Sequence, residues 1–132
     1  WSVTSYTELR RDALSIERWN ILNPTKKQKI PHITKCIDNN VEIIVASSDY
    51  LKSLPDLIAK WTQVDLLSLG TDGFGRSDTR EALRNHFEVD ANWIVATTLS
   101  GLLKKGKIEK QVYVKAIKDL KIDIAKIDPV IA

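Results

Sequence analysis

A short apolar segment followed at once by a glycine-rich loop is the feature that most constrains how this chain can fold. Residues 66–69 read Leu-Leu-Ser-Leu, which is typical of a buried strand, and three glycines fall within residues 70–75. Residues 82–87 then form a run of helix formers. Glycine permits positive φ and close backbone approach. Because ligands and partners usually meet a parallel α/β sheet at the carboxyl ends of its strands, this loop is the candidate site.

The end of the loop carries a helix-start signal. Asp78 and Glu81 have the spacing of a capping box, and their carboxylates would lie at the positive end of the helix dipole. The sequence therefore predicts a strand, a glycine loop and a helix in direct succession.

The remaining pattern alternates strands with helices. Residues 41–46 are nearly continuous in apolar, β-branched side chains, as in a central parallel strand, and the alternation of residues 1–5 predicts a further strand. Ser5 and Glu8 form a capping box for a helix to about Trp19. This alternation predicts an α/β domain with a mostly parallel sheet and three visible strands.

Further helices are indicated by their caps and by 3.6-residue periodicity. Residues 47–49 offer caps for a helix that reaches Trp61, in which Pro55 predicts a kink or a restart with Ser53 as the new cap. Two more helices are expected after the glycine loop: one starts after Asp90 and stops at Gly106, and the last runs over about residues 108–120.

Composition limits the class of protein. The 132 residues predict one domain, residues 1–132, and 43% hydrophobic and 28% charged residues are typical of a soluble globular chain. A single cysteine, Cys36, predicts a reducing, cytoplasmic setting. The net charge of +3 is too mild to predict nucleic-acid binding, and no apolar run is long enough to predict a membrane span.

The absence of methionine, and a first segment that starts like a strand already under way, predict a domain taken from a longer chain.

No set of residues predicts catalysis within the chain. Gly73 and Gly75 lack the third glycine of a dinucleotide fingerprint, because position 78 is an aspartate, and no phosphate-loop lysine follows. His32 and Cys36 have a metal-ligand spacing but no second pair. Ser77 lies two helical turns from His86, too far for a simple triad. We therefore expect no catalytic, cofactor-binding or metal-binding residue, and read Asp72, Gly73, Phe74, Gly75, Arg76, Ser77 and Asp78 as an interface or structural loop.

The loop and its neighbours resemble a known family. Residues 70–81, Gly-Thr-Asp-Gly-Phe-Gly-Arg-Ser-Asp-Thr-Arg-Glu, and residues 86–91, His-Phe-Glu-Val-Asp-Ala, closely resemble the C-terminal domain of the homodimeric bacterial pyruvate dehydrogenase decarboxylating component. Residues 1–9, 17–20 and 48–50 and the closing stretch from Ile122 resemble the same family. A looser core, Asp72, Phe74, Gly75 and Ser77, looks like transketolases generally.

This resemblance implies a fold and a role. The fold would be a three-layer α/β/α sandwich with a mostly parallel sheet, like the transketolase C-terminal domain, with its first strand and helix outside these residues. The parent enzyme would be a homodimer that uses thiamine diphosphate and magnesium, bound by its other domains, to decarboxylate pyruvate. It would pass the acetyl group to the lipoyl group of an acyltransferase partner. The implied role of this domain is non-catalytic, in dimer assembly and active-site support.

Two other functions are consistent with the residues. A free-standing module could bind an anion or a nucleotide at the loop of residues 70–77. The chain could also be the C-terminal domain of a transketolase proper, which would act on sugar phosphates. The long matches over residues 76–81 and 86–91 favour pyruvate dehydrogenase over transketolase.

Overall fold

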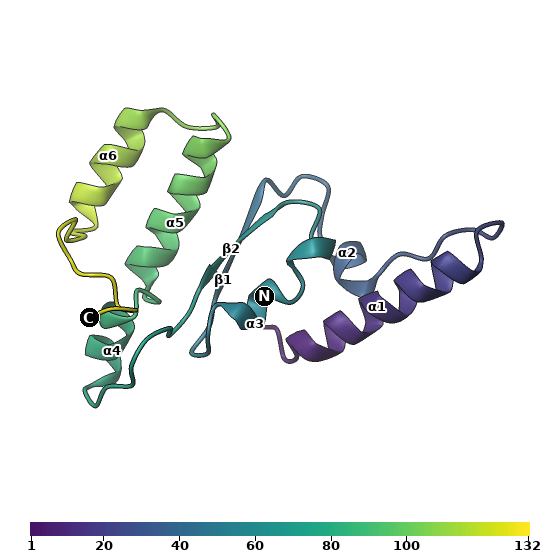
Figure 1. Ribbon diagram of the computed structural model, residues 1–132. Helices are drawn as coiled ribbons and strands as arrows, with labels where there is room; N and C mark the ends of the chain where they lie inside the picture. Colours follow the sequence, from purple (N-terminus) through teal and green to yellow (C-terminus); the bar gives the residue numbers. More distant parts are fainter.

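The computed structural model describes all of residues 1–132 and confirms an α/β chain in which helices and strands alternate (Figure 1). In chain order the elements are α1 (Tyr6–Leu22), α2 (His32–Cys36), β1 (Ile43–Ser47), α3 (Ser53–Asp56), the single 3-10 turn η1 (Ala59–Trp61), β2 (Asp65–Leu69), α4 (Arg80–His86), α5 (Ala91–Lys104) and α6 (Lys110–Asp119).

The sheet consists of two parallel strands, β1 and β2, paired from Ile43 opposite Asp65 to Ser47 opposite Leu69. Figure 1 shows α1, α2 and α3 on one side of this sheet and α5 and α6 on the other, so helices cover both sides, as in a three-layer α/β/α arrangement. Helix α5 approaches the sheet closely at Gly101, where a Cβ atom would overlap the side chain of Ile43. The sheet ends at the glycine loop, which leaves the carboxyl end of β2.

The prediction of a strand at residues 1–5 is wrong. These residues have no regular structure, no strand pairs with them, and Trp1 is 90% exposed. Alternation in a short segment cannot show whether a partner strand exists, and a strand without a partner leaves its backbone groups unpaired. Trp1, Ser2 and Val3 instead line a cavity of about 690 Å³ beside β1.

The boundaries of helices α1 and α5 follow the predicted caps. The Ser5 hydroxyl accepts the Glu8 N–H at 3.2 Å, and α1 continues to Leu22, three residues beyond the predicted end. Gly106, at φ 68°, ends α5 as predicted. Its N–H donates to the Leu103 carbonyl and the next N–H donates to the Leu102 carbonyl, which is the Schellman pattern of helix termination.

The helix predicted from residues 47–49 to Trp61 is replaced by two short pieces, α3 and η1. Pro55 does not interrupt a helix, because it lies in the first turn of α3, where backbone N–H groups have no intrahelical partner to lose. Ser53 is the first residue of α3 rather than its cap, and no side chain caps this end.

The core lies between α1, α2 and the turn that precedes β2. Ala13, Ile33, Ile58 and Trp61 form one buried cluster. The indole N–H of Trp61 donates to the Glu17 carboxylate at 2.9 Å, and the Lys60 ammonium pairs with the same carboxylate at 2.6 Å. These contacts, that of Lys60 first, hold the pKa of Glu17 below its usual value.

None of the helices combines the length and the apolar character that a membrane span requires.

Candidate functional site

The first half of the glycine loop is joined to the segment that follows β1. A Cβ atom on Gly70 would lie 2.5 Å from the Tyr50 carbonyl oxygen and 2.6 Å from the Lys52 nitrogen. Only glycine permits this approach between two backbones. The Thr71 N–H donates to the same Tyr50 carbonyl at 2.9 Å, and the Asp72 carboxylate accepts the Lys52 N–H at 3.2 Å. The Asp72 carboxylate is therefore bound to backbone within the chain.

Gly73 is held against the C-terminal end of the chain. Its φ is 109°, a conformation that residues with a Cβ atom rarely adopt, and a Cβ there would lie 2.5 Å from the Pro129 carbonyl oxygen. Pro129 is buried. The glycine thus has two independent reasons to be present, its conformation and the backbone that covers it.

The second half of the loop is open. The Phe74 side chain is 80% exposed, and no atom lies within 4 Å of the Cβ position of Gly75, whose φ is not positive. No hydrogen bond within the chain involves Ser77. The one side-chain hydrogen bond of this half is made by Arg76, whose Nη1 lies 3.4 Å from Nδ1 of His86 at the end of α4.

The helix after the loop begins one residue later than the capping box predicted. Thr79, not Asp78, is the N-cap of α4, and its hydroxyl accepts the Ala82 N–H at 3.3 Å. Asp78 instead accepts the Thr79 N–H at 2.7 Å. The spacing rule could not separate these adjacent residues, because both carry an oxygen suited to a cap.

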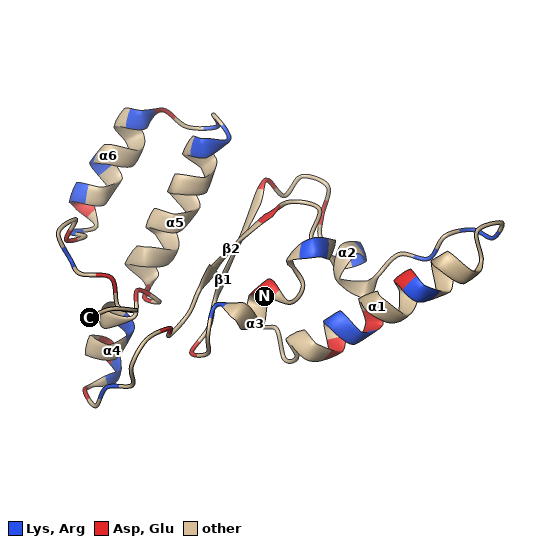
Figure 2. Cartoon of the chain, viewed as in Figure 1, with Lys and Arg blue, Asp and Glu red and all other residues tan.

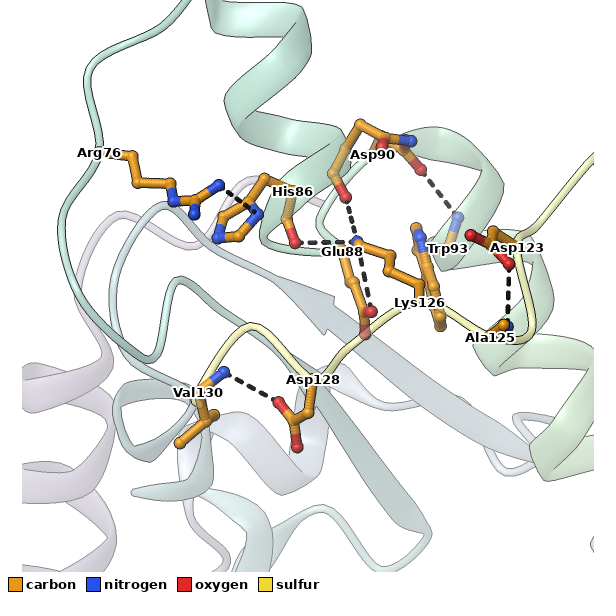
Figure 3. A network of polar contacts seen from close by, with 11 residues as sticks. Arg76, His86, Glu88, Asp90, Trp93, Asp123, Ala125, Lys126, Asp128 and Val130 are labelled. Carbon is orange, nitrogen blue, oxygen red and sulfur yellow. Dashed lines mark hydrogen bonds and ion pairs between the residues drawn. The ribbon is translucent and has the colours of Figure 1, made fainter. Parts of the chain in front are cut away.

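Lys126 fastens the C-terminal tail to the end of α4, as Figure 3 shows. Its ammonium donates to the carbonyl oxygens of Asn85 at 2.6 Å and His86 at 2.9 Å, and it pairs with the Glu88 carboxylate at 3.3 Å. It also lies over the ring of Trp93 at 5.4 Å. A cation at this position complements the negative end of the helix dipole and satisfies carbonyl groups that a helix end leaves free.

His86 lies between two positive charges. Desolvation by its surroundings lowers the pKa of His86 most, and the neighbouring Arg76 and Lys126 lower it further, while Glu88 acts in the opposite direction. The neutral imidazole is therefore the favoured form, and it can accept a hydrogen bond from the Arg76 guanidinium.

A groove of about 520 Å³ lies between the open half of the loop and α4. Its apolar lining is Leu83, Phe87 and Val89, and its glycines are Gly73 and Gly75. Its charged lining residues are Arg76, Arg80, Arg84, Asp49 and Asp78. Figure 2 shows basic segments, in blue, along α4 and in the loop before it. This groove can accommodate an anionic group but contains no nucleophile paired with a base.

The other residue pairs weighed from the sequence do not form larger sites. Cys36 Sγ and His32 Nε2 lie 3.4 Å apart, and no group of three or more His, Cys, Asp or Glu side chains that could hold a metal occurs in the chain. No hydrogen bond joins Ser77 to His86, whose ring faces Arg76 (Figure 3).

Sequence reasoning missed Lys126 and Glu88. They are 38 positions apart and meet only because α4 ends in a Schellman-type turn, in which Glu88 takes a φ of 62° without glycine. The Glu88 N–H donates to the Asn85 carbonyl and the Val89 N–H to the Arg84 carbonyl. No local pattern in the sequence marks such a turn when its positive-φ residue is a glutamate.

Comparison with known proteins gives relatives that all carry the same name. The chain is 45% identical to the pyruvate dehydrogenase E1 component of Pseudomonas aeruginosa over 130 residues, which is 98% of the chain and 15% of that protein. It is 45% identical to the same component of Escherichia coli K12 over 133 residues, which is 100% of the chain and 15% of that protein. It is 37% identical to the same component of Mycolicibacterium smegmatis over 123 residues, which is 93% of the chain and 13% of that protein.

The chain thus spans about 15% of the length of the first two of these curated relatives. The family model described as the transketolase-like TK C-terminal domain matches residues 1–90, which hold both strands, the glycine loop and α4. The chain therefore belongs to the family of transketolase-like C-terminal domains.

Proposed function

We propose that this chain is the C-terminal domain of a pyruvate dehydrogenase, an enzyme that decarboxylates pyruvate and transfers the acetyl group to the lipoyl group of an acyltransferase. The observation that carries the proposal is 45% identity to pyruvate dehydrogenase E1 components over 98–100% of the chain. The relatives bear this name rather than that of a transketolase or of a free-standing binding module, which favours this function over the two alternatives. The proposal includes a cytoplasmic location for the enzyme.

The role of the domain is assembly and support of the active site rather than catalysis. Its accessible surface is 9407 Å², whereas a compact monomer of 14.9 kDa would expose about 7,000 Å². The excess exceeds the area that a standard protein interface buries, about 1,600 Å². Large apolar side chains such as Trp1, Phe74 and Ile131 are more than three-quarters exposed. A surface of this size and character supports packing against other parts of a larger enzyme, including a second subunit.

The cofactor of the parent enzyme would be thiamine diphosphate with magnesium, and the residues of this chain do not fit it. No cluster of three acidic, histidine or cysteine side chains is available to hold the metal. In the groove beside the glycine loop, two carboxylates, Asp49 and Asp78, offset the charge of two of the three arginines, which leaves a net charge of only +1 to face a diphosphate. We place the cofactor site in other domains of the parent and derive no catalytic step in this chain.

The loop of Asp72–Asp78 would act as a structural and interface element. Its first half is fixed by Lys52 and Pro129, and its second half presents Phe74 and Arg76 to the outside. This division suits a loop that is anchored in its own domain and packs against another.

The test uses the parent enzyme with and without residues 1–132. Pyruvate decarboxylation is followed with an artificial electron acceptor in thiamine diphosphate and magnesium, and the dimer fraction is measured by sedimentation. We expect the truncated enzyme to become monomeric and to lose activity. A parent that never decarboxylates pyruvate would refute the pyruvate dehydrogenase assignment, whereas a truncated enzyme that stays dimeric and active would refute the assembly role alone.

A further inference from the structure

Three arginines that line the groove have no acidic partner. Arg76, Arg80 and Arg84 recur every fourth residue, line the same 520 Å³ groove and are exposed. The ion pairs of the chain, at N–O distances up to 4.0 Å, all involve other residues. The contact of Arg76 is with the neutral ring of His86, which leaves its charge uncompensated. The groove therefore presents three guanidinium groups, which are suited to bind carboxylates in pairs of hydrogen bonds.

Exposed apolar side chains adjoin these arginines. Phe74 is 80% exposed and lies between the two glycines that line the groove. Val130 and Ile131 are 46% and 78% exposed, and the Cα atom of Val130 is 3.3 Å from the Cβ position of Gly73. We call Phe74, Arg76, Arg80, Arg84, Val130 and Ile131 the loop–arginine surface. Arginine and aromatic residues beside aliphatic ones are the composition of protein interfaces.

The backbone of the open loop also offers unused donors. The N–H groups of residues 73–78 make no hydrogen bond within the chain. An extended peptide could accept from these donors through its carbonyl groups while its side chains reach the arginines. A compact anion could engage only a few of them.

The carboxylates of the groove distinguish between possible ligands. Asp49 and Asp78 reduce the net charge of the lining to +1, since three arginines face two aspartates. A compact polyanion would meet these carboxylates at short range. A protein segment can direct its own carboxylates toward Arg80 and Arg84 and leave the aspartates to its N–H groups or to water. A small anion would also leave Phe74 and Ile131 in solvent.

We propose that the loop–arginine surface binds an acidic protein segment with at least one apolar side chain, supplied by the part of the parent polypeptide that lies outside residues 1–132. This rests on the proposed function, in which most of the parent's length lies outside this chain, as it does in the relatives. The arginines of this surface would bind the acidic residues of the segment by charge complementarity. Phe74, Val130 and Ile131 would contact its apolar side chain.

The test is photo-crosslinking in the full-length parent enzyme. Phe74 is replaced by the photoreactive residue p-benzoylphenylalanine, and the crosslinked peptides are identified by mass spectrometry. We expect a peptide from the parent's own polypeptide, rich in Asp and Glu, and a yield that falls as sodium chloride rises from low to high concentration. The double variant Arg80→Glu/Arg84→Glu should reduce this yield at least tenfold.

The matched control is Arg10→Glu, which reverses an exposed arginine on α1 that has no ion pair. It should leave the yield unchanged, and circular dichroism should show that all variants fold. Crosslinks to a segment without acidic enrichment, crosslinks only to a separate protein, or a yield that the double variant does not reduce would each overturn the proposal. Pyruvate decarboxylation by the same parent tests the proposed function separately, so the two failures can be told apart.

Discussion

The two halves of the glycine loop differ in what surrounds them. In the first half, Gly70 lies against the backbone of Tyr50 and Lys52, and Gly73 lies against the backbone of Pro129. Phe74–Ser77 contacts almost nothing of its own chain, and Gly75 has no atom within 4 Å of its Cβ position. The fold of the domain thus requires one half of the motif, whereas the only side-chain hydrogen bond that holds the other half within the chain is that of Arg76 with His86.

This comparison separates two reasons for glycine in one motif. At Gly70 the reason is space alone, and at Gly73 it is both space and a φ of 109°. At Gly75 neither reason exists within the chain. A glycine that the fold does not need can still be needed where another surface comes close, which agrees with the open half as an interface.

The largest expected effect comes from valine in the anchored half. Gly73→Val should destabilise the chain by about 3 kcal/mol, because positive φ costs a residue with a Cβ about 1–2 kcal/mol and the clash with the Pro129 carbonyl adds to this. Gly75→Val should change the free energy of unfolding by only about 0.5 kcal/mol. Urea unfolding of both variants measures the difference. Equal losses in the two variants would contradict the division of the loop.

Lys126→Met should have the next largest effect, about 2 kcal/mol, because it removes a charged donor from two helix-end carbonyls and leaves the half-buried Glu88 without a partner. Since Lys126 and Pro129 hold the same C-terminal tail, the tail should also become sensitive to carboxypeptidase. Lys115→Met, on an exposed position of α6, is the control and should lie within about 0.5 kcal/mol of the unmodified chain. Similar stability of both variants would show that the tail is not held by Lys126.

The boundary between loop and helix can be tested at its cap. Thr79→Ala should destabilise the chain by about 1 kcal/mol, because it removes the oxygen that accepts the Ala82 N–H. Ser77→Ala, two residues earlier in the open half, should cost less than about 0.5 kcal/mol. Thermal unfolding of both variants in the same buffer measures this difference in stability. A larger loss for Ser77→Ala would place the start of the ordered segment earlier than the structure has it.

How far the sequence predicts this molecule depends on whether the determining contacts are local. Strands β1 and β2 were predictable from their short apolar runs and helices α5 and α6 from their 3.6-residue periodicity, with Asp90 and Gly106 marking the two ends of α5. Residues 1–5 were predicted wrongly, since a strand depends on a partner that a local pattern does not reveal. The glycine loop itself was predicted as the candidate site.

The contacts that divide the loop could not be predicted. Pro129 lies against Gly73 across 56 positions, and Lys126 meets Glu88 across 38. Both contacts depend on the path of a tail with no regular structure and on two non-glycine residues at positive φ, Glu88 and Lys121. Such conformations are imposed by the packing of the whole chain rather than by the residue that adopts them.

The smallest expected effect concerns the one contact that holds the open half, Arg76 with His86. The folded chain favours neutral His86, so the unfolded chain binds the proton more readily. The contribution to stability is therefore present above the usual histidine pKa of 6.5 and is lost as the pH falls below it.

Arg76→Gln should raise the pKa of His86, measured by an NMR titration of its ring. The value should stay below the usual one, because desolvation is the larger cause. His86→Gln should lose less stability than the unmodified chain between pH 7.5 and 5.5. An unchanged titration in Arg76→Gln would contradict the interaction of Arg76 with His86.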